Sequence, residues 1–170
     1  MSEPTYRDAG PRDAEALADL GARSFTETFG PLYDSADLRV FLEQHTAERW
    51  ASEIANPAKD VRLVDCDGEL VGYAKLAPPT LPFTTDRTAV ELGQFYVLKP
   101  FQGAGVAAML MDWVLTRARQ RGAEELYLSV FTDNHRARRF YERYSFEFVQ
   151  TYAFMVGNHA DEDIIMRLTL

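Results

Sequence analysis

A short stretch in the second half of the chain contains two glycines and three alanines. It reads KPFQGAGVAAML over residues 99–110 and runs from a turn into an apolar helix. The first four N–H groups of a helix have no intrahelical partner, and the aligned peptide dipoles place about half a positive charge there. Because Gly103, Ala104, Gly105 and Ala107 are small, a phosphate can approach the backbone itself and needs no lysine. The stretch predicts an anion site built from peptide groups.

Two other interpretations of this stretch are open. A tight turn before an ordinary helix has the same appearance, since glycine is a common residue. The letters GAGVAA also satisfy the dinucleotide fingerprint G-x-G-x-x-A, with Asp133 as an acidic residue near the end of the next strand. That fold needs two βαβαβ halves, however, and only about a quarter of the chain follows this unit. Pro100 also interrupts the strand-to-glycine turn, so the dinucleotide interpretation is the weaker one.

The span 90–146, taken together, resembles the coenzyme A binding core of the GNAT superfamily of N-acetyltransferases. In that family the motif Gln/Arg-x-x-Gly-x-Gly/Ala binds the pyrophosphate of acetyl-CoA. Here the motif is carried by Gln102, Gly105 and Ala107, and the neighbouring amides belong to Gly103, Ala104 and Val106. The resemblance therefore implies acetyl-CoA as the cosubstrate.

A second family motif follows in the expected order. It consists of an asparagine before a helix that contains Phe-Tyr-Glu, and it is carried by Asn134, Phe140, Tyr141 and Glu142. Ser145 stands where the family usually has glycine, at the end of this helix, and this departure affects no reacting group.

The resemblance also implies roles for individual residues. Tyr141 would be the general acid, because a phenol with a reference pKa of about 10 can protonate a thiolate whose reference value is about 8.5. Glu91 would deprotonate the incoming ammonium, often through water. The backbone of a splayed or bulged strand would pair with the pantetheine arm; its residues are Phe95, Tyr96 and Val97. The alternatives are core packing for Tyr141 and a solvated strand-end charge for Glu91.

The acceptor is indicated only loosely. The segment 24–33 lies where the family places its acceptor lid, and it mixes aromatic rings with a carboxylate, a combination that suits an alkylammonium. The expected substrate-binding residues are Phe25, Glu27, Phe29 and Tyr33, with Asp34 nearby. The tail FMVGNHADEDIIM resembles the end of bacterial polyamine acetyltransferases. An equally open alternative is that these aromatic rings belong to the core and the charges face solvent.

Hydrophobic periodicity predicts the elements that must position these residues. Gly68 after Asp67 favours a hairpin turn, Gly93 indicates a bulge, and Ser35, Thr46 and Asn134 are expected helix N-caps. We expect strands at 5–10, 61–66, 69–76, 89–98, 125–130, 146–155 and 163–170, and helices at 11–25, 36–45, 47–56, 106–121 and 135–144. The expected fold is α/β (α+β): one GNAT-like domain over residues 1–170, with a central mixed, mostly antiparallel sheet flanked by helices.

Composition excludes several classes of function. The chain has 170 residues and a net charge of −8, which disfavours nucleic acid and anionic membranes as partners. Cys66 is the single cysteine and the three histidines are far apart in sequence, so we expect no disulfide and no metal site. With no membrane span or signal peptide in the pattern, a cytoplasmic location is expected. A homodimer is compatible with the sequence but not specified by it.

These observations favour an acetyl-CoA-dependent N-acetyltransferase that acts on a primary amine, either a small amine or a polyamine, by direct attack on the thioester. An acetyltransferase for protein or peptide N-termini shares the same core and would need an open acceptor groove. A non-catalytic acyl-CoA-binding module would keep the glycine turn but has no need for Tyr141 or Glu91.

Overall fold

The computed structural model describes residues 2–43 and 45–170, except for the side chains of Thr28, Phe29 and Leu32. The strands are β1 (Thr5–Asp8), β2 (Asp60–Cys66), β3 (Glu69–Ala77), β4 (Ala89–Val97), β5 (Glu125–Phe131), β6 (Glu147–Val156) and β7 (His159–Thr169). The helices are α1 (Ala14–Phe29), α2 (Ser35–Leu42), α3 (Ala47–Ala55), α4 (Val106–Gln120) and α5 (His135–Arg143). Within this part of the chain, no helix is long and apolar enough to cross a lipid bilayer.

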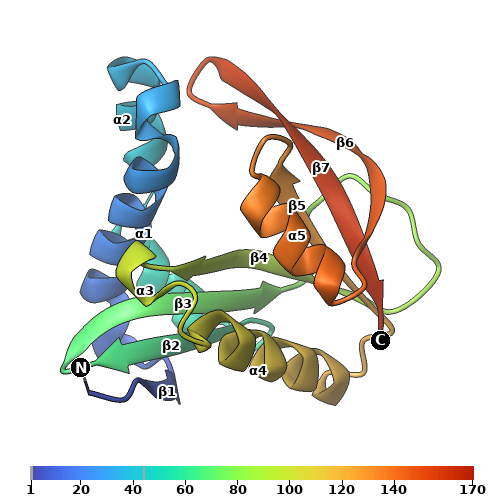
Figure 1. Cartoon of the computed structure of the whole chain (residues 1–170), viewed down its shortest axis with the longest axis horizontal. Coiled ribbons are helices and arrows are strands. Elements are labelled where there is room, and N and C mark those ends of the chain that lie inside the picture. The colour runs from blue at the N-terminus through green and yellow to red at the C-terminus, as the bar shows by residue number, and fades with distance from the viewer. Residues whose placement is uncertain (1, 44) are drawn as a thin grey trace.

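The strands form one mixed sheet in the order β1-β2-β3-β4-β5-β7-β6. Every neighbouring pair is antiparallel except β4 and β5, which are parallel. The expected mixed, mostly antiparallel sheet with flanking helices is therefore confirmed (Figure 1).

The parallel pair β4 and β5 separates after a short contact. Only residues 89–91 of β4 pair with residues 125–127 of β5, although both strands continue for several residues (Figure 1). The bulge expected at Gly93 is also present, because Lys75 pairs with Gln94 and Leu76 with Leu92, which leaves Gly93 unpaired between them. The sheet is therefore opened at its centre.

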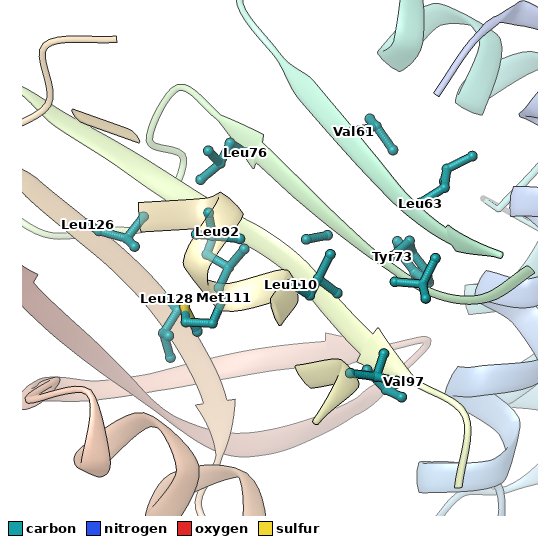
Figure 2. Packing of buried hydrophobic residues seen from close by; sticks show 14 of the residues in the cluster. Val61, Leu63, Tyr73, Leu76, Leu92, Val97, Leu110, Met111, Leu126 and Leu128 are labelled. Atoms are coloured by element: carbon teal, nitrogen blue, oxygen red, sulfur yellow. The ribbon is translucent and has the colours of Figure 1, made fainter. Parts of the chain in front are cut away.

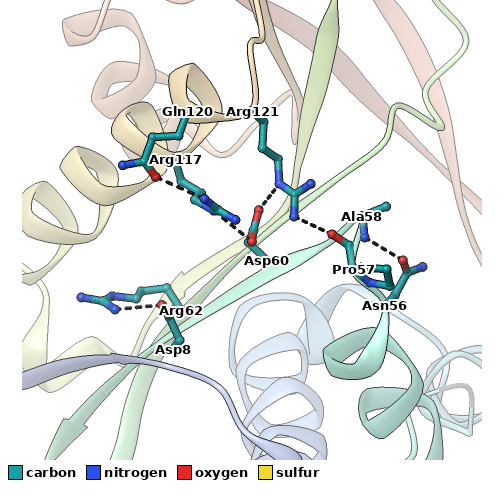
Figure 3. A network of polar contacts seen from close by, with 9 residues as sticks. All are labelled: Asp8, Asn56, Pro57, Ala58, Asp60, Arg62, Arg117, Gln120 and Arg121. Carbon is teal, nitrogen blue, oxygen red and sulfur yellow. Dashed lines mark hydrogen bonds and ion pairs between the residues drawn. The ribbon is translucent and has the colours of Figure 1, made fainter.

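The core fills the space between the sheet and the helices. Leu110 and Met111 of α4 are fully buried with Leu92, Leu126 and other apolar strand residues (Figure 2). A polar network fastens α4 to the start of β2, where Asp60 accepts from Arg117 at 3.0 Å and from Arg121 (Figure 3). This attachment fixes the helix whose N-terminus faces the opening between β4 and β5.

Most expected turns and caps are present, with two corrections. Asp67 and Gly68 have φ of 55° and 83° in the β2–β3 turn, and Thr46 and Asn134 cap α3 and α5. Ser35 is not the cap of α2, because the neighbouring Asp34 accepts from the Ala36 N–H instead. The last strand begins at His159 and not at Asp163, since the alternation of buried and exposed residues extends back toward the turn.

Ser145 ends α5 in the left-handed region, with φ of 73°. Glycine adopts this conformation freely, whereas an L side chain is strained there by about 1 kcal/mol. The departure from the family's glycine is therefore accommodated by the backbone at the end of the helix.

Candidate active site

A cavity of about 1330 Å³ lies where β4 and β5 separate. Its walls come from α1, α3, β3, β4, β5, α5 and β7, and its floor at one end is the turn before α4. Most of the residues expected to bind a ligand meet in this one place, although they come from segments far apart in the sequence.

The glycine turn forms one end of the cavity. Gln102, Gly103, Gly105 and Ala107 line it, whereas Ala104 and Val106 do not. Gly103 and Gly105 have φ of 82° and 84°, which glycine tolerates, and nothing among the described residues lies within 4 Å of a Cβ placed on either. Helix α4 starts without a side-chain cap, so its first N–H groups are left for another acceptor. This open, uncapped helix start fits a pyrophosphate.

Basic side chains also line the cavity. Lys99 lies beside the turn, and three arginines line the cavity from α5: Arg136, Arg139 and Arg143. Their spacing of three and four residues places them on one face of that helix. The local positive charge contrasts with the net charge of −8 of the whole chain and suits a polyanionic ligand.

The residues expected to contact the pantetheine arm border the opening. Phe95, Tyr96 and Val97 line the cavity, and β3 pairs with their strand on the other side. Among the described residues, this part of β4 has no strand partner on the side of β5. An extended ligand can therefore lie along this side of β4, where the Val97 carbonyl already accepts a hydrogen bond from the Gln102 side-chain amide.

Tyr141 lines the cavity from α5 and is 8% exposed. Its ring packs edge-on against Phe140 at 5.6 Å and Phe146 at 5.7 Å between ring centroids. Burial raises the pKa of the Tyr141 phenol well above its usual value, so that the phenol keeps its proton throughout the neutral range. Asn134 also lines the cavity, and its side chain accepts from the Ala137 N–H and begins α5.

Glu91 lies under the loop that connects β3 to β4 and does not line the cavity. Its carboxylate accepts from the N–H of Thr80 at 2.9 Å, the N–H of Leu81 at 3.0 Å and the hydroxyl of Thr80 at 3.1 Å. At 8% exposure it is not the solvated strand-end charge considered as the alternative. Its general-base role stays a prediction.

The residues expected to contact the acceptor divide into two groups. Phe25 and Glu27 of α1 line the cavity, and Glu27 accepts from the Tyr96 hydroxyl at 2.9 Å. Tyr33 is buried behind Phe25, with its ring 6.0 Å from the Phe25 ring between centroids, and does not line the cavity. The side chain of Phe29 lies outside the described residues. Asp34 is the cap of α2.

Several charged residues of the cavity were missed from the sequence. Lys75 of β3 pairs with Glu53 of α3 at 3.4 Å, and burial lowers the pKa of Lys75. Asp161 and Asp163 of β7 line the opposite wall and are each 7% exposed. One feature of the sequence indicated this pair. Asp161 and Asp163 are separated by one residue, Glu162, at the start of an otherwise apolar strand.

Comparisons with known proteins agree with this geometry. Residues 17–146 match the acetyltransferase (GNAT) family. An uncharacterized N-acetyltransferase of Mycobacterium tuberculosis is 33% identical over 155 residues, which cover 91% of this chain and 96% of the relative. A probable spermine N(1)-acetyltransferase of Bacillus subtilis subsp. natto is 30% identical over 84 residues, covering 48% of this chain and 55% of that protein.

A solved structure is similar over the whole fold. The PaiA N-acetyltransferase of Thermoplasma acidophilum, in complex with coenzyme A, matches with a TM-score of 0.78 and 18% identity. The match covers 99% of this chain and 100% of that one.

Proposed function

This chain belongs to the acetyltransferase (GNAT) family, whose cosubstrate is acetyl-CoA, and we propose that the acceptor of its acetyl group is a small primary amine or a polyamine. One observation carries the proposal. A single cavity runs from an uncapped, positively charged helix start, past the part of β4 that does not pair with β5, to carboxylates on β7. An anionic donor and a cationic acceptor can therefore meet at the opening between β4 and β5.

The described residues fit acetyl-CoA at the basic end. The N–H groups at the start of α4 would hold the pyrophosphate, and the part of β4 that does not pair with β5 would hold the pantetheine arm. The arginines of α5 offer charge for a further phosphate. Bound in this way, acetyl-CoA supplies a thioester, the activated carbonyl that an amine can attack.

Tyr141 is the proposed proton donor to the departing sulfur. Its phenol lines the cavity, and burial keeps it protonated. The same apolar surroundings that keep the phenol protonated also disfavour a thiolate anion, so the proton passes to the sulfur as the C–S bond breaks. The packing of the ring against Phe140 and Phe146 holds the phenol in place.

A small acceptor is favoured by a contact between α2 and the β6–β7 hairpin, which bridges one side of the cavity. The tip of the β6–β7 hairpin lies against α2 (Figure 1), where the Asn158 N–H donates to Asp37 at 3.0 Å. Below this contact, Phe41 and Phe154 pack edge-on with ring centroids 5.8 Å apart. A peptide would need an open groove on this side. The similarity to a probable spermine N(1)-acetyltransferase supports a polyamine as the acceptor.

An acceptor panel tests the proposal. We would measure release of the CoA thiol from acetyl-CoA with spermidine, a neutral aromatic amine and a short peptide with a free N-terminus. The proposal expects spermidine to have the highest catalytic efficiency, and it expects added salt to weaken that preference, because partly exposed charge pairs are screened over about 8 Å at physiological salt. A preference for the peptide would favour the N-terminal acetyltransferase. If no thiol is released with any of the three acceptors, a binding module would be favoured.

A further inference from the structure

Strand β7 presents two carboxylates to the cavity. Along this strand Asp161, Asp163 and Ile165 share one face, while the exposed Glu162 points the other way. In the register of the sheet, Asp163 lies opposite Phe131 of β5 and Tyr152 of β6. Both aspartates are buried against the sheet, and both line the cavity.

The two carboxylates differ in their partners. Asp161 lies 3.2 Å from Nε2 of His159. The carboxylate of Asp163 has no hydrogen bond or ion pair with any residue that the structure describes, although Asp163 is only 7% exposed. The Asp163 oxygens are not among the enclosed polar atoms that lack a partner, so they are accessible from the cavity, and a donor that enters the cavity can bind them.

A second acceptor atom, beside the cavity, also has no partner among the described residues. Oε1 of Gln94, on β4, is buried with no hydrogen-bond partner among the described residues, and Gln94 lines the cavity. A carboxylate and an amide oxygen both accept hydrogen bonds. An ammonium group has three donors and no acceptor, so it matches the acceptor-only Asp163 carboxylate better than an alcohol or a carboxylate would.

We infer that Asp163, supported by Asp161, is the subsite that binds the ammonium group of the acceptor and removes its proton before attack. This inference rests on the proposed function and makes it more specific. The acceptor class is a primary amine that carries its positive charge in solution, and the residue that deprotonates it is a carboxylate of β7.

The surroundings of Asp163 suit a proton acceptor at neutral pH. Burial, and next the charge of Asp161, raise the pKa of Asp163 to about 7. On its own strand the titratable neighbours are Asp161 and His159. On β6 the residue opposite Asp163 is Tyr152, whose phenol can titrate, and on β5 it is Phe131, which cannot. The other charged groups that line the cavity from α1, α3 and β3 are Glu27 and the ion pair of Lys75 with Glu53. A base with a pKa near the working pH exchanges protons efficiently.

Glu91 is less suited to this task. Its carboxylate oxygens already accept hydrogen bonds from three donors, namely two backbone N–H groups and the Thr80 hydroxyl. It does not line the cavity. The structure therefore favours Glu91 as a residue that positions the loop after β3, and Asp163 as the one that meets the amine.

The proton balance is complete. Asp163 takes one of the three protons of the ammonium and later passes it to solvent. The nitrogen then attacks the thioester carbon, the C–N bond forms and the C–S bond breaks. Tyr141 gives its proton to the sulfur and recovers a proton from the nitrogen by way of solvent. The products are the N-acetylated amine, which keeps one N–H, free CoA and one proton.

The test compares Asp163→Asn with Glu162→Gln, a matched control whose side chain lies on the other face of the same strand. With spermidine as the probe, we expect kcat/KM of Asp163→Asn to be lower than that of the wild type by about 10²-fold or more. In the wild type kcat/KM should decrease below about pH 7, and this pH dependence should be absent in Asp163→Asn. Asp161→Asn should move that decrease to lower pH, because the charge of Asp161 contributes to the raised pKa. The affinity for acetyl-CoA should be unchanged in all three variants.

A binding measurement separates this inference from the proposed function. Spermidine is titrated calorimetrically into the CoA complex of wild type and of Asp163→Asn. Binding that is lost in the variant upholds the subsite, even if the wild type acetylates no amine and the proposed function fails. If the wild type acetylates spermidine while Asp163→Asn keeps its rate within about 3-fold and its pH profile, the inference is wrong and the proposed function stands. Failure of the wild type to bind spermidine also overturns the subsite.

Discussion

The side-chain amide of Gln102 donates a hydrogen bond of 2.8 Å to the backbone carbonyl of Val97. This contact ties the glycine turn to the end of β4, so that the start of α4 keeps a fixed position relative to the part of β4 that does not pair with β5. The two parts that would hold the pyrophosphate and the pantetheine arm are therefore joined directly. Gln102 acts through this bond, and the donors that face the cavity are backbone N–H groups.

The first prediction concerns that turn. Gly105→Val should weaken binding of acetyl-CoA by about 10-fold or more, because the new side chain occupies the open space above the helix start and strains a residue with φ of 84°. Gly122→Val is the matched control, since Gly122 has φ of 77° just beyond the other end of α4 and also has open space around it. Both variants should lose stability, and only Gly105→Val should lose affinity in a calorimetric titration. Equal affinities would refute the phosphate assignment.

The second prediction concerns proton donation. Tyr141→Phe keeps the ring and its packing but removes the hydroxyl, so we expect kcat to fall about 10²-fold with little change in thermal stability. Tyr144→Phe, at the residue that follows the same helix, should be close to wild type. Because the pKa of Tyr141 is raised by burial, the wild-type rate should show no decline that titrates with a phenol near pH 10. Unchanged turnover in Tyr141→Phe, under conditions where chemistry limits the rate, would reduce Tyr141 to a packing residue.

The third prediction concerns the basic face of α5. Replacing Arg136, Arg139 and Arg143 together by glutamine should raise the Kd of acetyl-CoA about 10-fold at low salt and less at high salt, because the side chains are exposed and their charge is screened. CoA without its 3′-phosphate should be affected less than CoA. Arg119→Gln, on an exposed part of α4 outside the cavity, is the control. A loss of affinity that is independent of salt would argue against an electrostatic role.

The fourth prediction follows from the raised pKa of Asp163. Its carboxyl titrates at about 7 in the folded protein and near 3.9 in the unfolded chain, so folding takes up a proton between these values. The wild type should therefore lose stability as the pH rises from about 4 to 7. Relative to it, Asp163→Asn should gain about 2 kcal/mol at pH 8, less than the full shift implies because the cavity admits water.

The check on this effect is the difference in the free energy of unfolding between Asp163→Asn and wild type, measured in urea across the pH range. The difference should change between pH 4 and 8 for this variant and stay constant for Glu162→Gln. A constant difference for Asp163→Asn would mean that its carboxyl titrates normally.

The sequence predicted the parts of the site that are local. The glycine turn, the Asn134 cap and the bulge at Gly93 depend on residues within a few positions of one another, where the constraints on φ and hydrogen bonding act directly. The family motifs then placed Tyr141 and the part of β4 that does not pair with β5 at the cavity.

The parts that the sequence did not predict depend on distant contacts. Glu91 is enclosed by a loop that begins more than ten residues earlier in the chain, and the partner of Glu27 is the Tyr96 hydroxyl, 69 residues away. Asp161 lies outside the expected strands, because nothing local distinguishes an early start of β7 from a longer turn. Only the pairing of β7 with β6 and β5 turns its side chain toward the cavity.

The most direct test of direct acetyl transfer to an amine follows an isotopically labelled acetyl group. The purified protein is incubated with labelled acetyl-CoA, with and without spermidine, and the protein and the small molecules are analysed by mass spectrometry. Because the single thiol, Cys66, is buried outside the cavity, we expect no label on the protein, and we expect labelled N-acetylspermidine in the same amount as free CoA. Labelled protein before the amine is added, or free CoA without an acetylated amine, would contradict the account.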